Sequence, residues 1–371
     1  MRGPAARPVV IAAGGTGGHF FPAEALTTEL IARGRRIVLL TDARSGAIRS
    51  EVFAGRECFV LKGAGIAGRG LLRSAAATAA LGAGVIQARA ILARLNPGAL
   101  VAFGGYPSVA PVLGARMLRQ APPIVLHEQN AVLGRANRFL SRGISLLALS
   151  FPETQLVPAG VKSAFIGNPM RPALAALTRA AYMPAGDHIN LAVLGGSLGA
   201  RVFSDVVPPA LIALPAELRS RLRLTQQCRA EDLDRVRQAY ATAGITAELS
   251  PFFPDVADRL AAAHLVIARA GASTVAELAV AGRPSILVPL PGAIDDHQTA
   301  NAHALVAANA AWMIPQPAFT PPTLTERLRA LMTRPEQLAE AAAAARTLAR
   351  PDAALRLADL VDSLMPQEAH S

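Results

Sequence analysis

The 371-residue sequence has only two cysteines, Cys58 and Cys228. They lie far apart and form no CxxC pair, which excludes a disulfide framework or a zinc site built on paired cysteines. This sparse cysteine usage is typical of a reducing compartment, so we expect a cytoplasmic protein.

Aromatic residues and long apolar runs are also scarce. Aromatic side chains make up 4% of the sequence, which disfavours a nucleic-acid-binding protein that stacks bases on aromatic platforms. No long apolar stretch precedes the glycine turn at 14–18, so we expect no signal peptide. The Ala/Gly-rich stretch 75–86 is well short of the ~20 residues that span a bilayer. We expect a soluble or peripheral protein.

Lysine is nearly absent, because only Lys62 and Lys162 occur, yet the formal net charge is +11. Arginine therefore carries almost all of the positive charge. The surplus reflects either the base composition of the genome or an anionic partner, such as a phosphorylated substrate or an acidic membrane.

The chain is long enough for two domains, and 52% of its residues are hydrophobic. Short apolar runs alternate with longer helical patterns, which predicts parallel sheets covered on both faces. The first series of strands is expected at 8–13, 36–41, 99–104, 123–128 and 145–150, with helices at 22–33, 71–95 and 107–119.

The alternation breaks over 167–190, a segment with three prolines that we interpret as a linker. A second series of strands is expected at 189–196, 222–227, 245–250, 264–269 and 285–290, and a last helix at 352–365. The sequence thus predicts an α/β protein with two doubly wound domains, at 1–170 and 171–350. We expect the last segment, 351–371, to pack back on the first domain.

Both series begin with a strand, then glycines, then a helix. The stretch "AAGGTGGHFFPA" (12–23) supplies Gly14, Gly15, Gly17 and Gly18, and "GGSLGA" supplies Gly195, Gly196 and Gly199. Glycines at this position let the backbone approach a bulky anion at a helix N-terminus. The spacing is not the dinucleotide fingerprint GxGxxG. His19 follows the first turn, as a general base or as a structural or capping histidine.

Two further motifs follow strands of the first series. "FGGYPS" (103–108) is either a third ligand turn or a simple turn. "HEQN" (127–130) is a dense polar cluster at a predicted strand end, although ion pairing or capping explains any single member.

In the second series, "ARAGASTVAEL" (268–278) places Ser273, Thr274 and Glu277 at a helix start. One alternative is a capping box. The other is a diphosphate held by the helix N–H groups, with Glu277 accepting both hydroxyls of a ribose. The polar loop "PLPGAIDDHQTANA" (289–302) follows, and its side chains suit sugar hydroxyls.

Taken together, "GGTGGH", "GGY", "HEQN", "GNPMR", "GGSLGA", "RAGASTVAE" and "DDHQTANA" closely resemble the MurG family in order and spacing, over about residues 9 to 310. This resemblance implies the GT-B fold, with two Rossmann-like domains facing a cleft. It also implies an inverting transferase that moves N-acetylglucosamine from UDP-GlcNAc to the MurNAc 4-hydroxyl of lipid I, undecaprenyl-pyrophosphoryl-MurNAc-pentapeptide, giving lipid II. The alternatives are another GT-B UDP-sugar enzyme, such as a 2-epimerase or a transferase with a different acceptor, and a nucleotide-sugar-binding protein.

The resemblance also implies roles for individual residues. His19 acts near the acceptor hydroxyl, with Glu128 as the rival base, and the lipid pyrophosphate lies against Gly14, Gly15, Gly104, Gly105 and Tyr106. The donor contacts are Thr16, Gly17, Gly18, Asn130, Arg171, Ser197, Phe253, Ala272, Ser273, Thr274, Val275, Ala276, Glu277 and Gln298. We find no metal motif at these turns and expect no metal and no cofactor.

A lipid acceptor requires a membrane surface, and we expect the inner face of the bacterial plasma membrane, without nucleic acid as a partner. Segment 61–90 mixes apolar residues such as Leu71 and Leu72 with Lys62, Arg69, Arg73 and Arg89, which suits anionic headgroups. Arg135, Arg138 and Arg142 extend this surface. The alternative is an ordinary amphipathic core helix with a solvated basic face.

Overall fold

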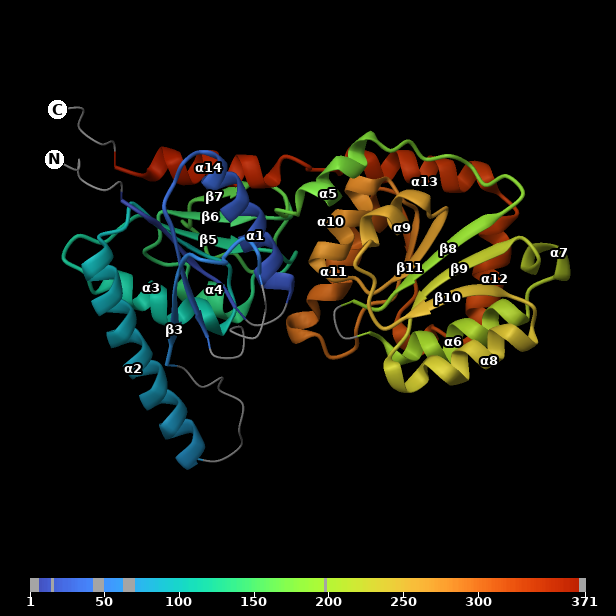
Figure 1. Ribbon diagram of the computed structural model, residues 1–371, viewed down its shortest axis with the longest axis horizontal. Helices are drawn as coiled ribbons and strands as arrows, with labels where there is room; N and C mark the ends of the chain where they lie inside the picture. Colours follow the sequence, from blue (N-terminus) through green and yellow to red (C-terminus); the bar gives the residue numbers. More distant parts are fainter. Residues whose placement is uncertain (1–6, 15–16, 43–49, 63–70, 197–198, 367–371) are drawn as a thin grey trace. The chain divides into compact units, whose positions relative to one another are not determined.

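The computed structural model describes residues 7–14, 17–42, 50–62, 71–196 and 199–366, and only the backbone of 71–76. The chain divides into two compact units (Figure 1). The first combines Met1–Arg171 with Asp352–Ser371, and the second is Pro172–Pro351. Each unit has its own parallel sheet and its own hydrophobic core.

The first unit contains a seven-stranded parallel sheet in the order β3-β2-β1-β4-β5-β6-β7. Strands β2 and β3 are added on one side of β1, and strands β4 to β7 are added on the other side. The topological switch point therefore lies between β1 and β4. The strands are β1 (Val9–Ala12), β2 (Ile37–Asp42), β3 (Glu57–Leu61), β4 (Ala99–Ala102), β5 (Ile124–Glu128), β6 (Leu146–Leu149) and β7 (Ser163–Phe165).

Helices bury both faces of this sheet, which explains why its central strands are apolar throughout. Val9 and Ile11 of β1 belong to the core formed with α1 and α14, whereas Val10 and Ala12 belong to the core formed with α2 and α3. The helices are α1 (Gly17–Ala32), α2 (Leu71–Leu95), the 3-10 turn η2 (Tyr106–Ser108), α3 (Val109–Arg116), α4 (Arg135–Leu140) and α14 (Ala353–Leu364).

The last helix, α14, packs on the first helix, α1. Leu357 and Val361 are fully buried in their shared core. Asp362 accepts hydrogen bonds from Arg33 Nη1 and from Arg35 Nε, each at 2.9 Å. Buried apolar contacts and the hydrogen bonds from two arginines to Asp362 together hold α14 against α1.

The second unit contains a six-stranded parallel sheet in the order β10-β9-β8-β11-β12-β13. Its switch point lies between β8 and β11, in the position that β1 and β4 occupy in the first unit. The strands are β8 (Ile189–Leu194), β9 (Leu222–Gln227), β10 (Thr246–Ser250), β11 (Leu265–Ala268), β12 (Ser285–Leu287) and β13 (Ala311–Met313).

The main core of the second unit lies between the sheet and α6, α8 and α12, through residues such as Phe203, Val236 and Leu328. Helix α10 ends at Gly282, whose φ of 60° favours glycine. The helices are α5 (Pro172–Ala175), α6 (Arg201–Ile212), α7 (Ala216–Arg219), α8 (Leu233–Thr242), α9 (Val256–Ala262), α10 (Ala272–Ala281), α11 (His297–Ala307), α12 (Pro321–Met332) and α13 (Pro335–Thr347), with 3-10 turns η3 (Ala176–Arg179), η4 (Ala230–Asp232), η5 (Ile294–Asp296) and η6 (Gln316–Ala318).

The prediction of two doubly wound parallel sheets is confirmed, and each predicted strand is present with its ends shifted by at most three residues. The sequence analysis missed three strands, β3, β7 and β13, which all lie at sheet edges. The predicted linker 167–190 was wrong in part, because it contains α5 and η3. Helix 22–33 begins earlier than predicted, since α1 starts at Gly17.

Candidate active site

The switch point of the first unit is built from glycine turns after β1 and β4. Gly104 and Gly105 have φ angles of 79° and 66°, a left-handed backbone that disfavours other residues. Ser108 Oγ donates to Gly104 O at 2.8 Å and stabilises this turn. The peptide groups of the turn are thereby held at the carboxyl end of β4, where ligands bind in doubly wound sheets.

His19 lies in the first turn of α1, beside the Gly104–Gly105 turn. Its Nδ1 lies 2.9 Å from the carbonyl oxygen of Phe103 and 3.1 Å from Gln129 Oε1. A Cβ built on Gly105 would lie 3.5 Å from His19 Nε2, an ordinary van der Waals distance, so the ring packs directly against this turn. Among the residues that the structure describes, Nε2 forms no hydrogen bond. The imidazole is therefore held through its Nδ1 atom.

Glu128, at the end of β5, lies in a different environment. It is 2% exposed, and both of its oxygens are engaged. Oε1 accepts from Asn130 N and Nδ2 at 2.9 and 3.1 Å. Oε2 accepts from Gly134 N and Asn137 Nδ2, each at 2.9 Å. These four hydrogen bonds to one carboxylate, called here the Glu128 clamp, hold the loop after β5 in its conformation.

The remaining predicted residues of the first unit surround this edge of the sheet. Gly14 is buried two residues after the end of β1, Gly17 and Gly18 begin α1, and Tyr106 begins η2. Asn130 follows β5, and the guanidinium of Arg171 lies 4.9 Å from the centre of the Phe21 ring on α1. Gly15 and Thr16 lie outside the described residues.

The switch point of the second unit begins with the glycines after β8. A Cβ on Gly195 would lie 2.4 Å from Ala200 N, so no larger residue fits. Gly196 and Gly199 have φ angles of 82° and 66°. Gln227, at the end of β9, accepts from Gly195 N at 3.0 Å and donates to Gly196 O at 2.9 Å, which holds the turn. Ser197 lies outside the described residues.

The helix N-terminus next to this turn is that of α10. Its N-cap is Gly271, which has no side chain, so Ser273 and Thr274 lie inside the helix and are not the N-cap. The capping-box alternative is therefore wrong for this helix. Ala272, Ser273, Thr274, Val275 and Ala276 form its first turns, and Glu277 follows on the same helix, half-buried. The N–H groups of a helix start and the helix dipole favour an anion here.

A buried arginine fastens the loop that follows β12 to this helix start. Arg269 is 9% exposed, and its Nη1 donates to the carbonyls of Val288 and Pro289 at 3.0 and 3.1 Å. Its Nη2 donates to Gln316 Oε1 at 2.6 Å. Burial lowers the pKa of Arg269 from its ordinary value. Asn301 on α11 adds a second tie, since its Nδ2 donates to Ala270 O at 3.1 Å.

This fastened loop leads to Gln298, whose Oε1 accepts from Leu290 N at 2.9 Å. The carbonyl end of the side chain is thus held by the loop itself. Phe253, after β10, is buried, and the guanidinium of Arg259 lies 4.0 Å from the centre of its ring. Phe253 and Gln298 both lie beyond the carboxyl ends of strands, β10 and β12 respectively.

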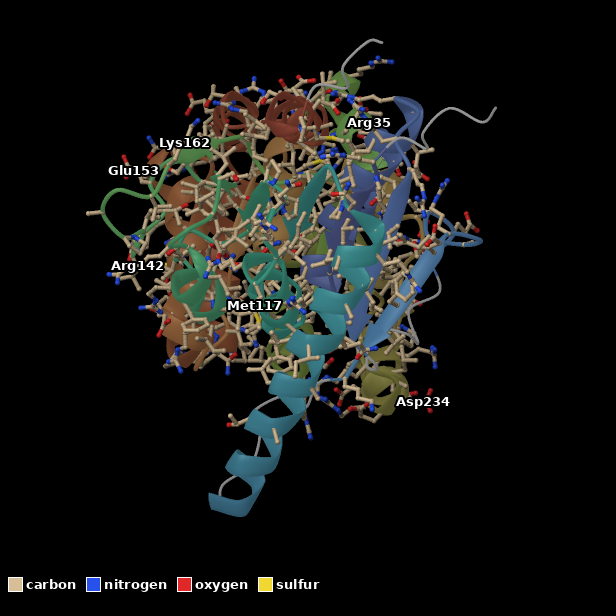
Figure 2. The ribbon with its side chains drawn as sticks, turned by 90° about the vertical axis from the view of Figure 1, so that its left-hand side faces the viewer. Arg35, Met117, Arg142, Glu153, Lys162 and Asp234 are labelled. Carbon is tan, nitrogen blue, oxygen red and sulfur yellow. The ribbon has the colours of Figure 1, made fainter. Side chains whose placement is uncertain are left out.

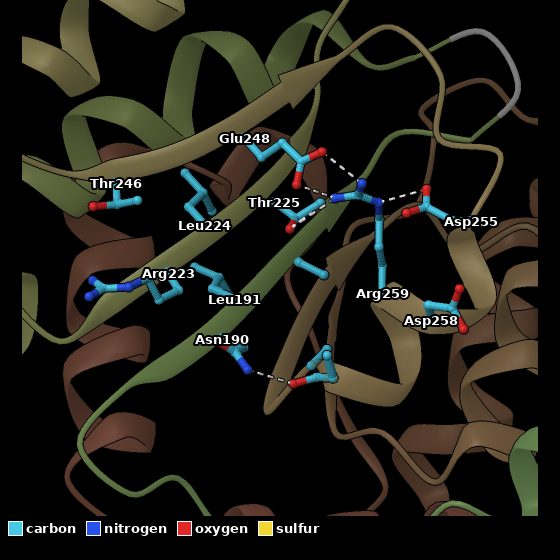
Figure 3. A pocket seen from close by; sticks show the side chains of 13 residues that line it. Asn190, Leu191, Arg223, Leu224, Thr225, Thr246, Glu248, Asp255, Asp258 and Arg259 are labelled. Carbon is cyan, nitrogen blue, oxygen red and sulfur yellow. Dashed lines mark hydrogen bonds and ion pairs between the residues drawn. The ribbon is translucent and has the colours of Figure 1, made fainter.

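A pocket of about 420 Å³ lies elsewhere in the second unit, along β8, β9 and β10 and against α9 (Figure 3). Arg259 donates to both oxygens of Glu248 and to Asp255, so its charge is matched within the pocket. None of the residues that line this pocket is one of the predicted site residues. The polar turns at the carboxyl edge therefore remain the candidate site.

Sequence reasoning placed His127 and Gln129 in the "HEQN" polar cluster but gave neither an individual role, and it did not single out Gln227 or Arg269. A usable signal existed for Gln227, because it is a polar residue at the carboxyl end of a predicted strand. For Arg269 the signal was weaker, since an arginine after "HLVIA" is as easily exposed as buried.

Comparison with known proteins defines the class to which this fold and site belong. Residues 9–145 match the glycosyltransferase family 28 N-terminal domain, and residues 190–357 match the glycosyltransferase family 28 C-terminal domain. The first match covers strands β1 to β5 of the first sheet, and the second covers the sheet of the second unit, so the chain is a two-domain glycosyltransferase of this class.

Relatives narrow the class to one family. UDP-N-acetylglucosamine--N-acetylmuramyl-(pentapeptide) pyrophosphoryl-undecaprenol N-acetylglucosamine transferase of Granulibacter bethesdensis is 63% identical over 97% of this chain and 94% of the relative. The protein of that name from Gluconobacter oxydans is 53% identical over 97% of this chain and 99% of its own. The crystal structure of Acinetobacter baumannii MurG aligns with a TM-score of 0.80 at 32% identity, covering 96% of this chain and 99% of that one. The chain belongs to the MurG family.

Among the described residues, no helix is both long and apolar enough to cross a bilayer.

Proposed function

We propose that this protein transfers N-acetylglucosamine from UDP-GlcNAc to the 4-hydroxyl of the N-acetylmuramyl residue in lipid I, which gives lipid II. The names of its close relatives support this donor and this acceptor. The observation that carries the proposal is the geometry of His19. Its Nδ1 is bound beside the glycine turn, and its Nε2 forms no hydrogen bond within the described part of the chain.

His19 is proposed as the general base in preference to Glu128. A base needs a lone pair that can reach the acceptor hydroxyl. The oxygens of Glu128 already accept four hydrogen bonds, two of them from backbone N–H groups. Proton abstraction by Glu128 would require this clamp to open, whereas Nε2 of His19 requires no such rearrangement.

The reaction is a single displacement with inversion. His19 Nε2 takes the proton of the 4-hydroxyl while that oxygen forms a bond to C1 of the donor sugar. The bond between C1 and the phosphate oxygen breaks, and UDP leaves with its electron pair. Helix N-termini and backbone N–H groups stabilise the charge that develops on the diphosphate.

The donor is proposed to bind mainly to the second unit. The diphosphate would contact the turn that contains Ser197 and the start of α10, and Glu277 would accept the ribose hydroxyls. Gln298 keeps its amide nitrogen for the sugar, because its oxygen accepts from Leu290 N. Phe253 would offer its main chain to the uracil, and Thr16, Gly17, Gly18, Asn130 and Arg171 would complete the donor contacts.

The acceptor is proposed to bind to the first unit. Its pyrophosphate would lie against Gly14, Gly15, Gly104, Gly105 and Tyr106. The positive φ angles of Gly104 and Gly105 support this placement, since they mark a glycine turn whose backbone a bulky ligand can approach closely.

The test is a product assay with purified protein, labelled UDP-GlcNAc and a lipid I analogue. We expect label in a lipid II analogue and release of UDP. UDP-GlcNAc incubated alone controls for the alternative of a 2-epimerase, which would produce the epimeric sugar nucleotide. Binding of UDP-GlcNAc without any product from either incubation would favour a nucleotide-sugar-binding protein and overturn the proposal.

The lipid acceptor also implies a surface that contacts the membrane, and the first unit offers one. Ile86, Met117 and Phe139 are 66%, 54% and 65% exposed. Hydrogen bonds join the segments that present them: Arg89 Nε donates to Met117 O, and Arg116 donates to the carbonyls of Leu140 and Arg142.

The same segments carry arginines. They are Arg89, Arg138 and Arg142, and Met117 and Arg142 lie on one side of the first unit (Figure 2). Exposed apolar groups on segments that also carry cationic side chains suit an anionic bilayer surface. The sequence analysis placed this surface on 61–90; residues 63–70 lie outside the described residues, and the side chains of 71–76 are not described.

A double variant tests this surface. We expect Ile86→Asp with Phe139→Asp to lower binding to vesicles containing anionic phospholipid by roughly ten-fold or more, because two inserted apolar side chains become charged. Co-sedimentation with vesicles measures the binding. Met183→Asp is the matched control, since Met183 is 69% exposed in the second unit. The proposal would be contradicted if vesicle binding changed neither in the double variant nor with the anionic lipid content of the vesicles.

A further inference from the structure

The carbonyl oxygen of Phe103, just after β4, fixes how the side chains around His19 are oriented. Two nitrogens lie 2.9 Å from this oxygen, His19 Nδ1 and Gln129 Nε2. A carbonyl oxygen can only accept hydrogen bonds, so both nitrogens must carry a hydrogen. The tautomer of His19 and the orientation of the Gln129 amide therefore follow from one backbone atom.

The rest of the network follows from this assignment. Gln129 Oε1, at 3.1 Å from His19 Nδ1, accepts from the same N–H group. The second hydrogen on Gln129 Nε2 points to His127 Nδ1 at 3.2 Å, which must accept it. His127 then carries its own hydrogen on Nε2, which lies 3.2 Å from Ser150 Oγ.

His127 can play this accepting role because it stays neutral. It is completely buried, and burial lowers its pKa to about 3. At neutral pH its Nδ1 therefore keeps the lone pair that holds the Gln129 amide. The other titratable side chain at this end of β5, Glu128, directs its oxygens to Asn130, Gly134 and Asn137.

We infer that Gln129 is a positioning residue for the transfer reaction. Together with the Phe103 carbonyl it holds His19 in the tautomer that has its proton on Nδ1, so that the lone pair of Nε2 remains available to the acceptor hydroxyl. The opposite tautomer would place a hydrogen on Nε2 and could not accept a proton there. This inference rests on the proposed role of His19 as the base.

The neutral amide has a second consequence. A carboxylate facing the N–H group of a histidine stabilises the imidazolium and raises the histidine pKa. An amide oxygen accepts a hydrogen bond from the same N–H group, but it carries only a partial charge and not a full negative charge. Gln129 therefore orients the His19 ring without placing a negative charge beside it.

Two variants of Gln129 test the inference by steady-state kinetics over a range of pH. We expect Gln129→Met to lower kcat by roughly ten-fold, which corresponds to the loss of the one hydrogen bond between Gln129 and His19. The KM for UDP-GlcNAc should be unchanged. We expect Gln129→Glu to move the acidic limb of the kcat profile to higher pH by about one unit, because a carboxylate then faces His19. A residue that only supports the fold would not move this limb.

Gln226→Met is the matched control, because Gln226 is also fully buried but bonds to Tyr240 within the second unit. It should retain the kcat and pH profile of the wild type. If Gln129→Met does not fold, nitrogen-15 NMR of histidine-labelled wild-type protein still tests the inference, with the His19 signals assigned by their loss in His19→Ala.

The NMR spectrum should show His19 with its proton on Nδ1. A proton on Nε2, or a Gln129→Met variant with wild-type kcat and pH profile, would overturn the inference. Full activity of His19→Ala would instead overturn the proposed base while leaving the tautomer result intact, so the two failures are distinguishable.

Discussion

His19→Ala should lower kcat by roughly 10²-fold or more, the contribution of a positioned general base, while the KM for UDP-GlcNAc changes little. The reason is that the imidazole acts on the acceptor hydroxyl and the proposed donor contacts do not include its ring. Removal of the ring leaves the Gly104–Gly105 turn in place, since Ser108 holds that turn independently. Initial rates at saturating lipid I analogue, with UDP-GlcNAc varied, measure both constants.

His188→Ala is the control for this variant, because His188 is exposed just before β8, at the opposite edge of the second sheet from the candidate site. His188→Ala should have the kcat and the KM of the wild type. A His19→Ala enzyme with unaltered kcat would remove His19 from the mechanism and return the role of base to Glu128 or to solvent.

Glu128→Gln should destabilise the protein by roughly 2–5 kcal/mol, because two of four buried donors lose their acceptor and meet an amide N–H₂ group instead. The substitution preserves the shape of the side chain, so lost packing is not a cause. Each carboxylate oxygen accepts from two donors, and the amide group meets one of these pairs whichever way it is turned. Thermal and urea unfolding measure the loss.

Glu153→Gln supplies the comparison, since Glu153 is an exposed glutamate of the same unit and should leave the unfolding midpoint unchanged (Figure 2). If Glu128 acts mainly as a base, Glu128→Gln should instead fold with wild-type stability and lose its activity. Wild-type stability together with a large loss of kcat would therefore contradict the structural role assigned to Glu128.

Much of the fold could be predicted from the sequence because the central strands are buried on both faces. Runs such as "PVVIAA" and "HLVIAR" are apolar at nearly every position, which is the pattern of a parallel sheet between two helical layers. The missed strands β3, β7 and β13 lie at edges. In β3 three of five residues are exposed, and β7 and β13 have only three residues each, so no long apolar run marks them.

The location of the candidate site could also be predicted, because glycine turns and polar residues follow the strands in sequence. What the sequence could not supply is the partner of each side chain. Glu128 and Gln129 are neighbours in "HEQN", yet Glu128 clamps the loop that leads to α4, whereas Gln129 bonds to His19, 110 positions away. The burial of Arg269 likewise depends on carbonyls of a loop some twenty residues later in the chain.

The central claim is that the two units divide the work, with the donor nucleotide on the second and the base on the first. Calorimetric titration of UDP-GlcNAc into Glu277→Ala and His19→Ala tests it most directly. We predict that Glu277→Ala weakens binding by roughly ten-fold or more, since it removes the proposed acceptor of the ribose hydroxyls, and that His19→Ala binds as the wild type. Unchanged binding by Glu277→Ala together with weakened binding by His19→Ala would contradict this division.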